Sequence, residues 1–330
     1  MGIQQMLLGA GAAGEVTGQV DFEDHTTHEY TTTWTVPNGV TKISVLCIGR
    51  GGITASGNVQ GGAGGGLAYM NNITVVPGDV YTIYICGGYY ATNNSGVSPY
   101  YSDEIWEVGS QIRWLSGTGH PWRVAAHCGV DQNSANPGGY EWSHASLTHG
   151  TFVEHSGGVG GGGSVSTSWG QTNYYHGGGG GAAGYAGDGG NGASGSASGG
   201  TAYDAASGSG GGGGGKEGWT QNPSGQTYTS QPAYTAGAGG GVGKYGKTNV
   251  TGSKGSTQGI SGSGGSGGTA SGTSTVQTYG GIAGNYGGGC CKWTSGTGSF
   301  TNNTVGGKGL VRIIWPGDTR YYPDTLTTDQ

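Results

Sequence analysis

The chain has 330 residues, of which 82 are glycine and nine are proline, and its formal net charge is −6 with a pI near 5.7. So little proline excludes collagen, the scattered Lys and Arg residues argue against a nucleic-acid partner, and no apolar run approaches the ~20 residues of a membrane helix. The start of the chain lacks the features of a signal peptide, so we expect synthesis in a cytoplasm without export by a classical signal.

The glycine-rich middle of the chain is expected to be ordered. Only 9% of all residues are charged and 10% are aromatic, whereas disordered segments are usually charged and poor in aromatics. Runs such as 177–181 and 210–215 bury almost no side-chain surface, so they need backbone hydrogen bonds to neighbouring runs. The ordered form available to them is a packed set of polyglycine II helices with three residues per turn.

Residues 1–29 begin with an apolar stretch that includes Met6, Leu7 and Leu8. We expect this segment to lie outside the folded body and to attach the protein to other proteins. Two hairpins are predicted next, one from 31–36 and 42–48 around a Pro-Asn-Gly turn, and one from 67–76 and 80–86 around a Pro-Gly-Asp turn. The apolar run 309–315 is predicted to return to these strands, so that 30–88 and 309–323 form a small β-sandwich.

Residues 89–156 form a separate block with little glycine repetition and many aromatic side chains. We interpret it as a loop insertion, with a short hairpin from 105–108 and 111–115. Residues 157–308 form the glycine-rich body, with loops at 164–176, 216–236 and 290–304, and 324–330 is a C-terminal tail. The predicted fold is therefore mainly β: a small β-sandwich with packed polyglycine II helices and long loops.

The aromatic block offers the best candidates for recognition, because Trp and Tyr rings stack on sugars and make rigid contacts with proteins. About half of the aromatic rings are expected to be structural instead, and the candidates to cover the glycine runs are Tyr185, Tyr203, Tyr245, Tyr279 and Tyr286. The predicted receptor-binding or partner-binding residues are Trp106, Trp114, Trp122, Tyr140 and Trp142, with His144 and Asn133 as hydrogen-bonding neighbours.

No motif supports an enzyme, a cofactor or a metal. The glycine cluster 62–66 follows a strand, but no helix-forming segment follows it to complete a phosphate loop. His144 and His149 would need a helix to converge on a metal, and their surroundings are loop-like. We expect the five cysteines to stay reduced and structural, and the oxidation state of the vicinal pair Cys290 and Cys291 is left open.

The two flanks resemble the glycine-rich virion proteins of tailed bacteriophages. The resemblance rests on the segments 33–49, 61–69 and 76–79, and on 309–323, which is similar to an ending common among such proteins of phages that infect marine cyanobacteria. The polyglycine core with projecting loops is similar, more distantly, to tail-tip adhesins of T-even-like phages.

This resemblance implies a non-enzymatic protein on the virion exterior, a tail fibre or tail-tip adhesin that binds a host glycan or outer-membrane protein. It also implies contacts with other virion proteins through 1–29, and a homo-oligomer, with a trimer favoured. The alternative is a purely structural virion component, such as a head decoration, collar or fibre subunit. A third alternative is ice or mineral binding by a flat polyglycine surface, which would require regular threonine rows and few protruding tryptophans.

Overall fold

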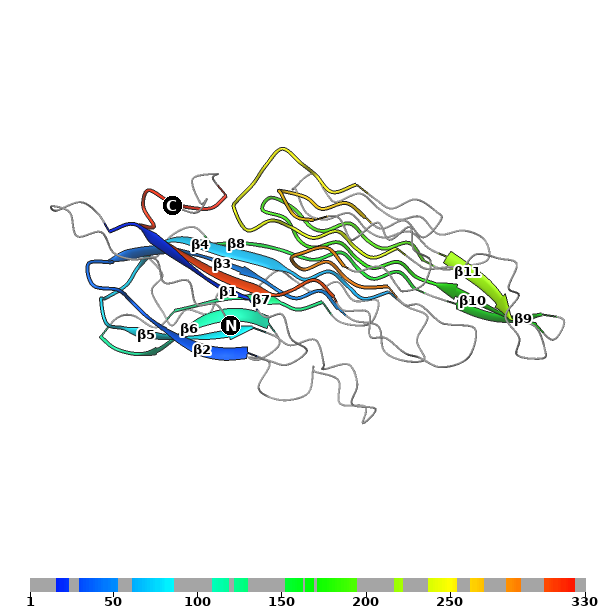
Figure 1. The fold of residues 1–330 in the computed structure, drawn as a ribbon, viewed down its shortest axis with the longest axis horizontal. Helices are drawn as coiled ribbons and strands as arrows, with labels where there is room; N and C mark the ends of the chain where they lie inside the picture. The colour runs from blue at the N-terminus through cyan, green and yellow to red at the C-terminus, as the bar shows by residue number, and fades with distance from the viewer. Residues whose placement is uncertain are drawn as a thin grey trace.

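The computed structural model describes residues 16–23, 30–52, 61–85, 109–118, 122–129, 152–162, 164–168, 171–194, 217–221, 237–253, 262–269, 283–291 and 306–323. Within these ranges the protein is mainly β and contains no helix, and its strands form antiparallel sheets. Figure 1 shows an elongated molecule, with two sheets at one end, the glycine runs in the middle and a small third sheet at the other end.

The first sheet has five strands in the order β1-β12-β3-β4-β8. These are β1 (Gly18–Glu23), β12 (Leu310–Trp315), β3 (Lys42–Ile48), β4 (Leu67–Thr74) and β8 (Phe152–His155). As predicted, the last strand of the chain returns to the first group, because β12 pairs with β3 along their whole shared length. The glycine-rich residues therefore form an excursion between strands that are neighbours in space.

The second sheet has four strands in the order β2-β5-β6-β7. These are β2 (Tyr30–Thr35), β5 (Val80–Ile85), β6 (Gly109–Ser116) and β7 (Arg123–His127). Both predicted hairpins around the early turns are wrong, because β2 and β3 belong to different sheets, as do β4 and β5. The turn signals at Pro37 and Pro77 are correct, but each turn carries the chain from one sheet to the other.

Two predicted segment boundaries are also wrong. Residues 18–23 belong to the first sheet, where Val20 and Phe22 pack against the core, and do not lie outside the folded body. The block 89–156 supplies β6, β7 and β8 to the two main sheets, so it is not only a loop insertion. The hairpin predicted over Gly109 and Ser110 is not formed, because both residues are inside β6 and pair with β7.

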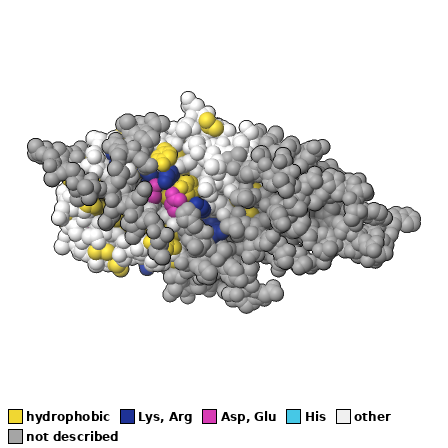
Figure 2. Space-filling view, viewed as in Figure 1, with side chains coloured by type: hydrophobic (Ala, Val, Ile, Leu, Met, Phe, Trp, Pro, Cys, Tyr) yellow, Lys and Arg dark blue, Asp and Glu magenta, His cyan; other side chains and the backbone are white. Residues whose placement is uncertain are grey.

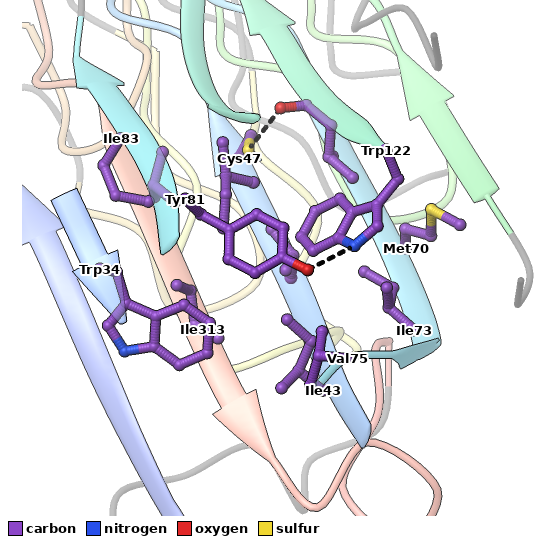
Figure 3. Close-up of a cluster of buried hydrophobic side chains, with 14 of the residues drawn as sticks. Trp34, Ile43, Cys47, Met70, Ile73, Val75, Tyr81, Ile83, Trp122 and Ile313 are labelled. Atoms are coloured by element: carbon purple, nitrogen blue, oxygen red, sulfur yellow. Dashed lines mark hydrogen bonds between the residues drawn. The ribbon is translucent and has the colours of Figure 1, made fainter. Parts of the chain in front are cut away.

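One large hydrophobic cluster lies between the two sheets (Figure 3). Trp34 and Tyr81 from the second sheet meet Ile313 and Cys47 from the first, and all four are buried. Cys47 donates a weak hydrogen bond to the carbonyl of Val124 at 3.5 Å. Burial raises the pKa of this thiol far above its ordinary value, so Cys47 behaves as a small hydrophobic residue.

The cysteines follow the predicted pattern only in part. Cys47, Cys290 and Cys291 are buried and are not disulfide-bonded. Cys128, which follows β7, is disulfide-bonded, so the expectation that every cysteine stays reduced is wrong at this position. Sequence spacing does not show which thiols the fold brings within bonding distance.

Each glycine run hydrogen-bonds to several other runs, and the partner changes at every residue. In 178–183 the NH groups of 178 and 181 donate to the run 190–193, and those of 179 and 182 donate to 237–240. The NH groups of 180 and 183 donate to 62–65. The N···O distances are 2.8–3.0 Å. The partner therefore repeats every three residues, whereas a β-strand would repeat every two.

The same three-residue period governs burial. Asp188, Asn191 and Ser194 are exposed, and the two residues that separate each of them from the next are buried. A methyl group added at Gly158 would lie 2.1 Å from the carbonyl oxygen of Gly190, and one at Gly161 would lie 2.0 Å from that of Ala193. Real Cβ atoms do not approach backbone oxygens this closely, so these interior positions accept only glycine.

The third sheet has the order β11-β10-β9 and lies at the end of the molecule opposite to the two main sheets (Figure 1). Its strands are β9 (Ser164–Ser168), β10 (Gln171–His176) and β11 (Glu217–Gln221). The segment 164–176, predicted to be a loop, is a β-hairpin instead, because Ser168 pairs with Gln171 across a two-residue connection.

Candidate functional site

The structure describes two of the seven residues that the sequence predicts for receptor or partner binding. These are Trp114 in β6 and Trp122, which directly precedes β7. The other five, Trp106, Asn133, Tyr140, Trp142 and His144, lie outside the described residues.

Trp122 lies in the core between the sheets. Its side chain is 3% exposed, its indole Nε1 donates to the hydroxyl of Tyr81 at 3.1 Å, and the two ring centroids are 4.7 Å apart (Figure 3). Trp114 is half-buried and packs against the same core. In this fold Trp122 presents no face to a binding partner, so it is not retained as a recognition residue.

The best-formed polar cluster in the described residues lies where β1 meets the glycine-rich body. We call it the junction cluster: Asp21, Glu23, Lys244, Tyr286 and Arg312. Figure 2 shows acidic and basic side chains gathered on the face of the molecule on which β1 lies in Figure 1. The two acidic side chains of the junction cluster lie on one face of β1, because successive side chains of a strand point to opposite faces. Val20 and Phe22 point to the core, and Asp21 and Glu23 point away from it.

Two cations hold the carboxylates of the junction cluster. The Nη1 of Arg312 donates to both oxygens of Asp21, at 2.8 and 2.9 Å, and the Arg312 side chain is completely buried. The Nζ of Lys244 donates to Asp21 and, at 3.2 Å, to Glu23. The hydroxyl of Tyr286 also donates to Glu23. Each carboxylate therefore has two donors.

The electrostatics of the junction cluster favour its charged form. Burial by itself would raise the pKa of Glu23, but the hydrogen bond from Tyr286 and the charge of Lys244 outweigh it and leave the pKa below its ordinary value. Burial would lower the pKa of Lys244, but Asp21 and Glu23 raise it overall. Burial and the neighbouring Glu23 carboxylate raise the pKa of the Tyr286 phenol, which stays protonated and donates.

The junction cluster joins the first sheet to two segments of the glycine-rich body, 237–253 and 283–291. Lys244 belongs to the first of these segments and Tyr286 to the second. The two segments also bond to each other, because Val242 and Tyr286 exchange backbone hydrogen bonds of 3.0 and 2.9 Å. The ring of Tyr245 lies 4.9 Å from the guanidinium carbon of Arg312, within the range of a cation–π contact. Among the described residues, this arrangement is a structural contact between sheet and body, in which each carboxylate is held by two donor residues.

A second contact between sheet and body is aromatic. Tyr185 is 1% exposed and stacks on Tyr322 with ring centroids 5.9 Å apart, and Tyr69 of β4 packs against both. The Tyr185 hydroxyl donates to the carbonyl of Gly243 at 2.8 Å and accepts from the NH of Gly246 at 3.2 Å. The prediction that Tyr185 covers the glycine runs is confirmed, because Ala182 and Ala183 lie in the same buried cluster.

Sequence reasoning did not identify the junction cluster. The alternation in Gln19-Val20-Asp21-Phe22-Glu23 is a strand signal that could have placed both carboxylates on one face. Nothing in the sequence indicates that Lys244, more than two hundred residues later, would pair with them. Among the described residues no group of His, Cys, Asp or Glu side chains is arranged to hold a metal ion.

Comparison of the chain with protein-family models, with curated proteins and with solved structures gives no match. In the part of the chain that the structure describes, no helix has the length and apolar character needed to cross a membrane.

Proposed function

We propose that this protein is a surface protein of a bacteriophage virion, a tail-fibre or tail-tip adhesin. A β-sandwich and a bundle of polyglycine II helices would form a rigid body that displays loops to a host receptor. The observation that carries the proposal is the hydrogen bonding of 178–183, where three consecutive residues donate to three different runs and the same order of runs then repeats.

This three-residue repeat of hydrogen-bond partners supports the assignment of polyglycine II helices. In a helix with three residues per turn, residues i and i+3 face the same neighbour, and each helix can bond to several others around it. The hydrogen bonds of 178–183 have this period, and so does the exposure of 188–194. The two main sheets with a common core between them support the sandwich, whose inner faces carry the buried residues.

A body of this kind is suited to display. Interior positions accept only glycine, because neighbouring backbones occupy the place of a side chain, as at Gly61 and Gly64. A bundle with bare interior positions offers no specificity of its own, so specificity has to come from side chains at its ends and on its loops. A bundle whose runs are hydrogen-bonded to one another also resists bending. Such stiffness suits a protein that holds a binding tip at a distance from the particle.

The recognition residues that we propose are Trp106, Tyr140, Trp142, His144 and Asn133, and the half-buried Trp114 stays a candidate beside them. The proposed partners are a host glycan or outer-membrane protein on one side and virion proteins on the other. We place the contact with the virion in 1–15, because 18–23 belong to the first sheet. A homo-oligomer, with a trimer favoured, remains part of the proposal.

Phage particles carrying Trp106→Ala or Trp142→Ala would test this function. We expect normal assembly and reduced adsorption to host cells, because loss of a hot-spot ring weakens binding by about 2 kcal/mol, or roughly 30-fold. Tyr321→Ala is the matched control, because this ring is 42% exposed on the sheet end of the molecule. If the Trp variants lose assembly while intact particles adsorb normally, the protein is a structural component and not an adhesin.

A further inference from the structure

Cys128 directly follows β7 and is disulfide-bonded. The sequence contains five cysteines, and three of them, Cys47, Cys290 and Cys291, are not disulfide-bonded. The cysteine that remains within the chain is Cys86, which directly follows the last residue of β5. Elimination therefore assigns Cys86, a residue outside the described ranges, as the partner.

The topology of the second sheet brings the two cysteine positions to the same end. β5 and β7 both pair with β6 in antiparallel fashion, so they run in the same direction on either side of it. Two strand spacings are about 9.6 Å, whereas the Cα atoms of a disulfide are about 4.4–6.8 Å apart. At this end β6 begins with Gly109, so beyond it no described strand of this sheet separates the two chain segments, and they can converge.

Hydrogen bonds on both sides of Cys128 hold its backbone against the glycine-rich body. The carbonyl directly before it accepts from the NH of Gly66 at 2.9 Å, and the NH directly after it donates to the carbonyl of Arg50 at 2.7 Å. Gly66 directly precedes β4, and Arg50 lies two residues after β3. A bridge from Cys128 would therefore attach the end of β5 to a position that is already hydrogen-bonded to runs from the first sheet.

We propose that Cys86 and Cys128 form a disulfide bridge that closes this end of the second sheet after the protein has left the cytoplasm. Thiols are kept reduced in the cytosol, so this timing rests on the expected cytoplasmic synthesis, whereas the pairing does not. Outside the cell a small disulfide such as oxidised glutathione is the oxidant. One cysteine thiolate attacks it and releases one glutathione, and the second cysteine thiolate attacks the mixed disulfide and releases the other. Two cysteine thiols thereby lose two protons and two electrons, and one glutathione disulfide becomes two thiols.

The bridge also bears on the proposed recognition function, and in this respect it rests on that function. Trp106 lies between the two cysteines in the sequence, and the other four recognition residues that we propose follow Cys128. The two segments that contain these residues leave the described fold at Ile85 and at Gly129. A covalent bridge here fixes both departure points relative to each other, and such preorganisation strengthens binding.

Peptide mapping by mass spectrometry, without reduction and with N-ethylmaleimide to block free thiols, tests the pairing in the purified full-length protein. We expect one linked pair of peptides, containing Cys86 and Cys128, and alkylation of the other three cysteines after unfolding. Alkylation of Cys86, a link from Cys128 to another cysteine, or a covalent dimer in non-reducing electrophoresis would overturn the pairing. Cells lysed directly into the alkylating reagent should yield both thiols alkylated, and a bridge already complete at that point would overturn the timing.

Thermal unfolding tests whether the bridge stabilises the fold. Reductant should lower the thermal midpoint of the oxidised protein by roughly 5 °C, because the bridge closes a loop of about 40 residues in the unfolded chain. Cys86→Ser/Cys128→Ser should match the reduced protein and show no response to reductant. Cys291→Ser is the matched control and should keep the response, because Cys291 is not disulfide-bonded. Equal midpoints with and without reductant would show that the bridge does not close the sheet.

Phage particles carrying Cys86→Ser/Cys128→Ser separate the bridge from its role in recognition. We expect normal assembly and adsorption reduced at least threefold. If peptide mapping finds the bridge but the variant particles adsorb normally, the bridge stands and its role in recognition does not. If Trp106→Ala and Trp142→Ala also leave adsorption unchanged, the proposed function itself fails, and the mapped bridge is unaffected by that result.

Discussion

Asp21 of β1 and Arg312 of β12 lie directly opposite each other in the ladder and form a two-contact ion pair, with Nη1 at 2.8 and 2.9 Å from the two carboxylate oxygens. Arg312 is completely buried, and Asp21 is its partner from the edge strand. The pair therefore fixes β1 to β12, the first and the last of the described strands.

Asp21→Ala should destabilise the protein by about 3 kcal/mol, because it leaves a buried guanidinium without its carboxylate. Urea unfolding followed by tryptophan fluorescence would measure the change. Asp318→Ala is the control: Asp318 is exposed, and we expect a change within about 0.5 kcal/mol. Equal effects of the two substitutions would show that the ion pair contributes nothing specific.

Protonation of Glu23 should account for part of the loss of folding stability in acid. Its pKa in the folded protein lies below the ordinary value of 4.5, so the unfolded chain binds the proton more tightly. The contribution of Glu23 is therefore complete above pH 4.5 and is lost as the pH falls through the folded pKa. Thermal midpoints measured from pH 7 to pH 3 should show a shallower acid limb in Glu23→Gln than in the unchanged protein, and parallel limbs would refute this assignment.

Gly179→Ala should disrupt the packing of the glycine runs. The added methyl group would lie 2.2 Å from the carbonyl oxygen of Gly289 and 2.7 Å from that of Cys290, and backbone cannot move aside as a side chain can. Overpacking costs about 1–3 kcal/mol, and we expect the upper end of this range. Ser194→Val is the control, because Ser194 occupies an exposed third position, and its thermal midpoint should hardly change.

Amide exchange should be slow across 178–183. Together these six NH groups donate to three different runs, so exchange requires several runs to separate. Hydrogen exchange with mass spectrometry should give this peptide protection similar to that of β3, whose strand lies inside the first sheet. Exchange within seconds in the folded protein would be incompatible with the bonded runs.

Trp122→Ala should reduce stability rather than binding alone. It removes a buried ring and leaves the hydroxyl of Tyr81 without its indole donor, and Trp→Ala substitutions in cores cost about 3–5 kcal/mol. The double variant Tyr81→Phe/Trp122→Phe removes both polar groups and should be more stable than Trp122→Phe alone. Double-mutant unfolding experiments would measure this difference, and strict additivity of the two single changes would rule out the coupling.

The strands themselves were visible in the sequence. The apolar and β-branched runs 42–48, 67–74, 80–85 and 310–315 predicted strands at these positions, because short apolar runs bounded by turn residues are typical of strands that are buried on both faces. Their pairing was not visible: a turn such as Pro37-Asn38-Gly39 reverses the chain equally well within one sheet or between two, and only the shared core decides.

What the sequence by itself determined is the chemistry of the glycine-rich part: with almost no side chains to bury, its order has to come from bonds between backbones. What only the tertiary structure decided is which runs become neighbours and which distant side chains meet, as Lys244 meets Asp21 and Glu23. The physical reason is that glycine runs are nearly identical to one another. Their register is therefore set by the sheets, the tyrosine contacts and the junction cluster at their ends, which are long-range contacts that no local pattern encodes.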